Sequence, residues 1–410
     1  MSLNRRTLIT AATAAAATPL LPRRGRAQGQ TIKIGVLGDQ SGVYRDVGGP
    51  TSVACVRQAV EEFGSKGFAV EVVVADHQNK PDVGANIARQ WFDRDGVDMI
   101  TDVANSAVGL AVNNVCKEKD KVYVNSTSAT ADLTGPQCAP TTVHIAYDTY
   151  MLAKGTGGAM VKAGGDTWFF ITADYAFGAA LERDTTGFVK AAGGKVLGSV
   201  RHPFPGNTDY SSFLLQAQAS GAKVIGICNA GVDTVNTIKQ AAEFGVTRRG
   251  GTKLAALLLF LNDVHAVGLP VAQGLVLTES FYWDLNDRTR AFTKRVLPKV
   301  AGNYPSMCHA GCYSGALHYL KVVADMGAAE AKKSGAATVA RMKAMPTEDD
   351  CFGAGHIRED GRKIHPSYLF EVKKPEESKG PWDYYKLVAT TPAEGAWKPL
   401  AEGGCPLVRS

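Results

Sequence analysis

Four side-chain hydroxyl groups, those of Ser126, Thr127, Ser128 and Thr130, follow directly on the apolar segment 122–124. That segment favours a buried β-strand, because branched and aromatic side chains pack well on a pleated surface. Hydroxyl groups and free backbone N–H groups bind anions, and small side chains let an anion approach the backbone. The stretch therefore predicts either an anion-binding turn at the end of a strand or an ordinary turn, which Ser, Thr and Asp commonly form.

Similar polar or small clusters follow other predicted strands. They occupy residues 38–42, 104–106, 172–178, 229–231 and 262–263. In open parallel sheets, ligands bind beyond the carboxyl ends of the strands, where loops run into helix N-termini. The N–H groups and the dipole at such positions favour a carboxylate or a phosphate.

Strand-like and helix-like segments alternate through two consecutive stretches of the chain. The first predicts strands at 31–37, 70–75, 97–103 and 121–125, with helices at 51–63, 83–92 and 108–119. The second predicts strands at 167–171, 194–200, 223–228 and 254–261, with helices at 177–192, 214–220 and 232–244. Such alternation is typical of βαβ units. The chain is thus predicted to be an α/β protein of two similar lobes with doubly wound parallel sheets. Later segments, helices at 288–301 and 310–326 and strands at 368–372 and 384–388, could be shared between the lobes.

The first 27 residues resemble an export signal. They carry Arg5 and Arg6 before an Ala-rich apolar stretch and small residues around Ala27, so we predict a twin-arginine-like leader cleaved near Ala27. Of the 45 Lys and Arg residues, five lie in this segment, which leaves 40 against 39 Asp and Glu. The excess charge therefore belongs mostly to the leader and gives no reason to expect nucleic-acid binding. No later apolar run has the length of a membrane span, so we expect a soluble, periplasmic mature protein.

Eight cysteines follow the leader. In an exported protein we expect some of them to form disulfides, although the pairing cannot be deduced from the sequence. The spacing of Cys308, His309 and Cys312 could indicate a metal site, but no second cluster at ligand spacing accompanies it. Two buried thiols on one helix are the simpler interpretation, and we expect neither a metal nor a cofactor.

The ordered set of segments resembles a known family. The chain reads IGVLGDQSGVY at 34–44, NSTSATADLT at 125–134, TADYAFG at 172–178 and NDVHAVGL at 262–269, and it closes with SYLFEVKKP and PWDYYK. In this order the segments are similar to the type I periplasmic solute-binding proteins of ABC importers, in the subfamily that binds leucine, isoleucine and valine. The resemblance covers nearly the whole mature chain. It implies two lobes, joined by a hinge of three chain crossings, that close on a small ligand.

The resemblance also implies which residues contact the ligand. The segment 128–130 would bind its carboxylate, residues 175–177 would form an aromatic wall, and Asp263 lies near the acid that pairs with an ammonium in amino-acid binders. Together with a further aromatic residue and the neighbouring loops, the expected ligand-binding residues are Tyr44, Asn105, Ser106, Ser128, Ala129, Thr130, Tyr175, Phe177, Asn229, Gly231 and Asp263.

Some of these residues have simpler interpretations. Tyr175 and Phe177 could belong to the core, and Asp263 could be a helix N-cap. Asn105 stands where the family often has Ser, and residues 281–283 read Phe-Tyr-Trp, which are more aromatic than a small aliphatic ligand needs. If Asp263 faces the ligand, we expect a branched-chain or related amino acid; if it only caps a helix, an aromatic carboxylate fits better.

The implied domain division is a leader at 1–27, a first lobe at 28–147 plus 282–351, a second lobe at 148–281 plus 352–395, and a C-terminal tail at 396–410. The implied partners are a small carboxylate ligand and the permease subunits of an ABC transporter in the inner membrane, with the chain as a monomer. We do not expect an enzyme, because the sequence lacks GxSxG, Walker-type and HExxH patterns. The alternatives are a ligand-sensing periplasmic receptor domain and an exported hydrolase.

Overall fold

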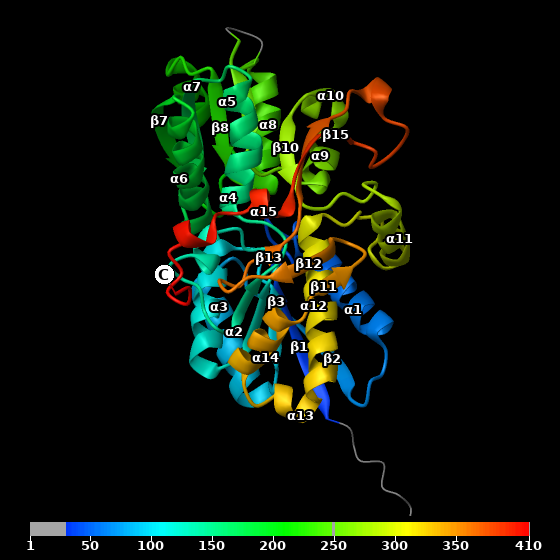
Figure 1. The fold of residues 1–410 in the computed structure, drawn as a ribbon. Coiled ribbons are helices and arrows are strands. Elements are labelled where there is room, and N and C mark those ends of the chain that lie inside the picture. The colour runs from blue at the N-terminus through cyan, green and yellow to red at the C-terminus, as the bar shows by residue number, and fades with distance from the viewer. Residues whose placement is uncertain (1–29, 248–250, 410) are drawn as a thin grey trace, which may run out of the picture.

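The computed structural model describes residues 30–247 and 251–409. The predicted export segment, residues 1–27, lies outside the described residues. Two α/β lobes lie one above the other in Figure 1, and each contains its own parallel sheet. The prediction of two lobes with doubly wound parallel sheets is therefore confirmed. None of the helices in the described ranges is long and apolar enough to span a membrane.

The first lobe contains a five-stranded parallel sheet in the order β2-β1-β3-β4-β5. Its strands are β1 (Thr31–Gly38), β2 (Ala69–Asp76), β3 (Met99–Asp102), β4 (Val122–Asn125) and β5 (Thr142–His144). β3 and β4 are buried along their whole length. Strands covered by helices on both faces are rich in apolar residues, as Met99 and Ile100 show in β3 and residues 122–124 in β4.

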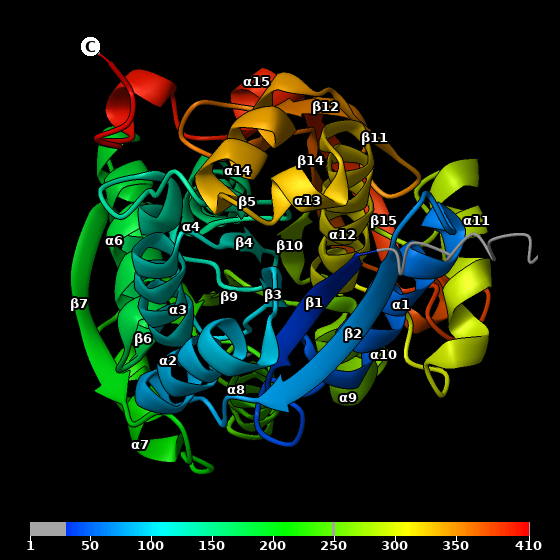
Figure 2. The same ribbon diagram turned by 90° about the horizontal axis from the view of Figure 1, so that it is seen from below.

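Helices cover both faces of this sheet (Figure 2). The helices of the first lobe are α1 (Gly49–Phe63), α2 (Pro81–Gln90), α3 (Ser106–Lys119), α12 (Met307–Met326), α13 (Ala328–Ala331) and α14 (Gly335–Ala344). α2 packs beside α3 on one face, and α1 packs beside α12 on the other. The two faces therefore have separate apolar cores.

The second lobe contains a four-stranded parallel sheet in the order β7-β6-β8-β9. Its strands are β6 (Thr167–Ala173), β7 (Lys195–His202), β8 (Val224–Cys228) and β9 (Lys253–Ala256). Its helices are α4 (Thr149–Leu152), α5 (Gly158–Lys162), α6 (Ala176–Ala191), α7 (Ser211–Ala219), α8 (Val232–Glu243), α9 (Leu261–Val267) and α10 (Leu269–Ala272). The predicted strand at 254–261 is shorter than expected: β9 ends at Ala256, and α9 begins at Leu261.

Two small antiparallel sheets complete the fold. One contains β10 (Val276–Glu279), β14 (Ser367–Val372) and β15 (Tyr385–Thr391); the other contains β11 (Thr347–Asp349), β12 (Gly353–Ile357) and β13 (Lys363–Ile364). The remaining helices are α11 (Asp287–Val296) and α15 (Ala393–Ala396), and short 3-10 or π turns lie at Trp91–Asp95, Ala131–Thr134, Ala153–Gly157, Leu297–Lys299, Pro375–Glu377 and Leu400–Glu402. The predicted helix 288–301 ends at Val296 because Pro298 cannot continue the hydrogen-bond ladder.

The chain passes between the two large sheets at three places. It runs from β5 into α4, which packs on α6; from β10 into α11, which packs on α1; and from β13 into β14, which pairs with β10. The segment just before the third passage contacts the first lobe, since Arg362 forms a β-bridge with His144.

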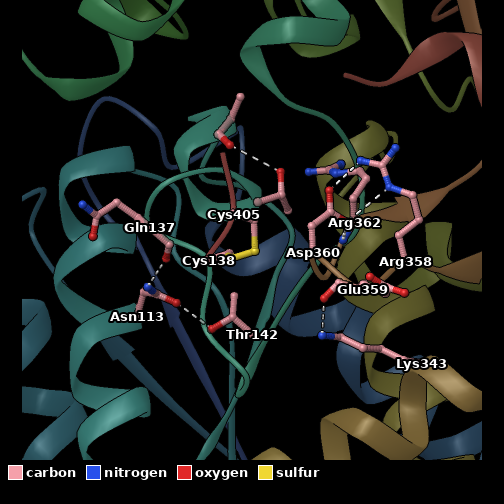
Figure 3. Close-up of a disulfide and its surroundings, with 12 residues drawn as sticks. Asn113, Gln137, Cys138, Thr142, Lys343, Arg358, Glu359, Asp360, Arg362 and Cys405 are labelled. Atoms are coloured by element: carbon pink, nitrogen blue, oxygen red, sulfur yellow. Dashed lines mark hydrogen bonds and ion pairs between the residues drawn. A yellow bond between two sulfur atoms is a disulfide. The ribbon is translucent and has the colours of Figure 1, made fainter. Parts of the chain in front are cut away.

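A disulfide joins Cys138 to Cys405 and confirms the prediction that some cysteines pair. Figure 3 shows it linking the C-terminal segment to the loop that follows the turn Ala131–Thr134 of the first lobe. The other six cysteines are buried free thiols: Cys55, Cys116, Cys228, Cys308, Cys312 and Cys351.

Candidate ligand-binding site

A small cavity lies between the lobes at the carboxyl ends of their parallel strands. In each sheet the order of the strands reverses at one point, between β1 and β3 in the first lobe and between β6 and β8 in the second. Such switch points open the crevice in which α/β proteins bind ligands. The cavity measures about 10 Å³, which holds no more than about one water. The cavity is lined by Tyr44, Val47, Ala104, Ser106, Thr127, Ala129, Tyr147, Tyr175, Phe177, Ala230, Leu258 and Phe260.

Aromatic side chains from the two lobes meet across this cavity. The hydroxyl groups of Tyr44 in the first lobe and Tyr175 in the second lie 2.5 Å apart. Phe204 stacks on both rings, with centroids 5.3 Å from Tyr44 and 4.1 Å from Tyr175. The lobes are closed on each other in this structure, so a solute larger than water enters only after they separate.

An unusual backbone turn at the end of β3 directs the first lobe's residues toward the cavity. Asp102 and Val103 have φ angles of 77° and 60°, in the left-handed region that a β-branched residue rarely adopts. The Asp102 carboxylate accepts hydrogen bonds from the Thr127 hydroxyl (2.7 Å) and from the N–H of Gly49 (3.2 Å). Burial raises the pKa of Asp102 to about 7, although these hydrogen bonds act in the opposite direction. Local strain of this kind is found where surrounding structure holds a functional loop in place.

Several hydrogen-bond donors on the first lobe are directed at no protein acceptor. The Ser106 hydroxyl accepts from the N–H of Thr130 (3.2 Å), which leaves its own hydrogen for another partner. Among the described residues, the N–H groups of Thr127 and Ala129 donate to no other protein atom. All three residues with free donors, Ser106, Thr127 and Ala129, line the cavity.

Helix N-termini converge on the same cavity. Ser106 begins α3, Tyr175 is the N-cap of α6, and Phe260 is the N-cap of α9. The positive end of each helix dipole therefore points toward the cavity and favours a negative group there. Within the described ranges, no Asp, Glu, Lys, Arg or His lines it. The site can thus hold a carboxylate with N–H and O–H donors alone, and the rest of its lining is apolar or aromatic.

The structure brings five of the predicted ligand-binding residues into the lining: Tyr44, Ser106, Ala129, Tyr175 and Phe177. The other predicted residues of the first lobe lie next to the lining with their side chains engaged. Asn105 caps α3 by accepting from the N–H groups of Ala107 and Val108. The Ser128 hydroxyl donates to the carbonyls of Val103 and Asn105, and Thr130 caps the turn that follows it.

The predicted residues of the second lobe that do not line the cavity also have local roles. Asn229 bonds His202, Thr234 and Thr237 behind the loop. Gly231 has a φ of 59°, and a Cβ placed on it would lie 2.7 Å from the Val43 carbonyl oxygen of the other lobe, so only glycine fits this interlobe contact. Asp263 accepts from the N–H of Phe260 (2.9 Å) as part of the cap of α9, and it does not line the cavity.

Seven lining residues were not predicted: Val47, Ala104, Thr127, Tyr147, Ala230, Leu258 and Phe260. Three of them, Ala104, Thr127 and Ala230, lie inside the polar clusters noted in the sequence. The sequence therefore predicted that these loops lie at the site, but not which of their residues face the cavity. The apolar residues gave no signal, because nothing in the sequence distinguishes a cavity-lining Leu or Phe from a core residue.

Comparison with known proteins identifies the family. A family model described as periplasmic binding protein matches residues 31–380. The chain belongs to the periplasmic binding protein family. A periplasmic binding protein of Burkholderia mallei is 51% identical, with a TM-score of 0.88, over 93% of this chain and 100% of that one. A branched-chain amino acid ABC transporter periplasmic ligand-binding protein of Burkholderia xenovorans is 41% identical, with a TM-score of 0.79, over 92% of this chain and 99% of that one.

More distant solved structures share the fold. A solute-binding protein of an R. palustris ABC transporter, in complex with 4-hydroxybenzoate, has a TM-score of 0.80 at 22% identity, over 90% of this chain and 99% of that one. No curated protein matches the chain. The family and these relatives are binding proteins by description. No group of three or more potential metal ligands occurs among the described residues, and Cys308, His309 and Cys312 lie buried on α12.

Proposed function

We propose that the protein is the periplasmic solute-binding component of an ABC importer, and that it captures a small carboxylate and delivers it, as a monomer, to permease subunits in the inner membrane. The observation that carries the proposal is the lining of the interlobe cavity. Free donors of Ser106, Thr127 and Ala129, together with the N-terminus of α3, form an anion site on one lobe. Aromatic side chains of the other lobe cover it. Membership of a family of binding proteins supports capture without catalysis.

The lining favours an aromatic carboxylate. Tyr44, Tyr175 and Phe177 supply flat apolar surface, and a well-placed pair of rings contributes about 0.5–1.5 kcal/mol beyond area burial. An amino acid would need an acceptor for its ammonium, and Asp263 already accepts from Phe260. A branched-chain amino acid is the second candidate, because the relative that is 41% identical carries that name.

We propose that the ligand is bound by lobe closure. The expected lobes are 28–147 with 282–351 and 148–281 with 352–395, followed by the tail 396–410. Pairing of β12 with β11 and β13, together with the bridge from Arg362 to His144, favours moving the last boundary to about residue 365. Contacts such as the Tyr44–Tyr175 hydrogen bond exist only when the lobes meet, so a ligand held by both lobes stabilises the closed form.

We also propose that residues 1–27 direct export and are removed near Ala27. The basic leader with small residues at its end supports this. N-terminal sequencing of the protein from a periplasmic fraction should then give a chain that begins close to Gln28. A full-length chain that stays in the cytoplasm would show that the leader is not a signal.

A thermal-shift screen tests the proposed function. The mature protein is heated with benzoates and hydroxybenzoates in one set and with leucine, isoleucine and valine in the other. A ligand at about 100 times its dissociation constant adds roughly 2.7 kcal/mol to the free energy of unfolding. One of the two sets should therefore raise Tm by several degrees, and the ligand should be recovered unchanged.

Small-angle scattering on the same samples provides an independent check. The radius of gyration should fall when the stabilising ligand is added, because the lobes close on it. If no member of either set stabilises the protein, the carboxylate-binding function is wrong; if a ligand is hydrolysed or altered, the protein is an enzyme instead.

A further inference from the structure

A second pocket lies between the lobes and shares no lining residue with the interlobe cavity. We call it the α9 pocket; its lining includes Arg45, Thr51 and Asn303 of the first lobe and Asn262 and Trp382 of the second. Figures 1 and 2 both show α1, α9 and α11 on the same side of the molecule. The α9 pocket measures about 460 Å³, within the range of roughly 300–1,000 Å³ that is typical of ligand sites. A small solute can therefore be held there while the lobes are closed.

A chain of amide hydrogen bonds crosses between the lobes at this pocket. The Asn262 amide nitrogen donates to the side-chain oxygen of Asn303 and to the carbonyl of Tyr304 (3.1 Å). Because a backbone carbonyl only accepts, these bonds fix which end of the Asn262 amide carries the nitrogen. The oxygen at its other end has no hydrogen-bond partner among the described residues, and Asn262 is 7% exposed. A buried acceptor without a donor costs free energy of folding, so it requires an explanation.

The first lobe offers donors to the same pocket. The Thr51 hydroxyl accepts from the Asn303 amide nitrogen at 2.8 Å, which leaves its own hydrogen for another partner. Two cations, Arg45 and Lys299, line the pocket with one acid, Asp46. Lys299 already forms an ion pair with Glu61, so Arg45 is the cation available to a solute. A guanidinium group can bind an oxyanion through two parallel hydrogen bonds.

We propose that the α9 pocket binds a second solute, a small hydrophilic anion that also carries a hydroxyl group. The anionic oxygens accept hydrogen bonds from Arg45 and Thr51 of the first lobe, and the hydroxyl donates to the free oxygen of Asn262 on the second. Since residues of both lobes hold the solute, its binding stabilises the closed form. This site goes beyond the proposed function and does not depend on which carboxylate occupies the interlobe cavity.

Two pairs of anions, matched in shape, test the inference by calorimetry at neutral pH. One pair is phosphate, which keeps a hydroxyl there, and sulfate, which has none; the other is malate and succinate, which lacks only the hydroxyl. The wild type should bind the hydroxyl-bearing member of at least one pair about fivefold more tightly than its partner, because a net hydrogen bond contributes about 1 kcal/mol. In Asn262→Ala this ratio should fall to about one. Arg45→Gln should instead weaken both members by about tenfold and keep the ratio.

Two controls locate the binding. Arg57→Gln makes the same change as Arg45→Gln at an exposed residue of α1 outside the pocket, and it should leave all affinities as in the wild type. Ser106→Ala, in the interlobe cavity, should leave affinity for these anions within about twofold; a large loss would place them in that cavity and overturn the inference. The inference is also wrong if the wild type binds neither phosphate nor malate, if it does not discriminate within either pair, or if Asn262→Ala keeps the wild-type ratio. None of these results bears on the carboxylate screen, so the proposed function stands or falls separately.

Discussion

Replacing Ser106 by alanine should weaken binding of the carboxylate ligand by roughly 10- to 150-fold, because a hydrogen bond to a charged group contributes about 1.5–3 kcal/mol. Ser106 lines the cavity at the first position of α3, and its hydroxyl already accepts from the N–H of Thr130. Its hydrogen is therefore free for an anion. The helix dipole adds to this contribution, since it favours negative charge at the N-terminus.

Calorimetry gives the dissociation constant of each variant, and thermal unfolding gives its Tm, so an effect on binding can be distinguished from an effect on stability. Ser106→Ala also removes the acceptor of the Thr130 N–H, so a modest fall in Tm of the free protein is expected along with the loss of affinity. Ser212→Ala, on the exposed surface of α7, is the matched control and should change neither quantity. Affinity of Ser106→Ala within twofold of the wild type would place the carboxylate elsewhere in the cleft.

The architecture was predictable because it depends on patterns that are local in sequence. Buried parallel strands produce apolar runs, and helices between them produce the 3.6-residue period. The strands β5 and β10 to β13 were missed, and they contain only two to five residues each. Segments of that length carry too few residues for alternation to be visible.

The position of the binding loops was predictable, but the direction of individual side chains was not. Within 126–130, Thr127 and Ala129 line the cavity, whereas Ser128 turns inward. That difference depends on Asn125, whose amide oxygen accepts from the N–H of Ser128 and whose amide nitrogen donates to its carbonyl. It also depends on the left-handed backbone at Asp102 and Val103. An Asn at the end of a strand does not by itself indicate which of the following side chains turns inward. The left-handed backbone has no local signature, because Asp102 is held by contacts with Thr127 and Gly49, which are distant in sequence.

The ambiguity at Asp263 is of the same kind. Asp is a common ligand for an ammonium and also a common residue at a helix start, and the sequence fits both roles. The structure places its carboxylate on the N–H of Phe260.

Removing the disulfide should lower the free energy of unfolding by about 2–4 kcal/mol, which corresponds to a fall in Tm of roughly 3–5 °C. Cys138 and Cys405 are separated by 267 residues, so the bond restricts a long loop of the unfolded chain. The tail that it anchors and the residue just before the tail also form noncovalent contacts with the rest of the chain. Arg358 donates to the carbonyl of Lys398 in the tail, and Lys154 of the second lobe donates to the carbonyl of Gly395 just before it.

Thermal unfolding of Cys138→Ala, Cys405→Ala and the double variant measures this contribution. The three variants should have nearly equal Tm values, because either single change already breaks the bond and the second then costs little more. A reductant should lower Tm of the wild type and leave the variants unchanged. The six buried thiols should not exchange with the disulfide, since burial raises the pKa of thiols such as Cys312, to about 12, and keeps them in the unreactive protonated form. Equal Tm values for wild type and variants would mean that the tail is held by its noncovalent contacts alone.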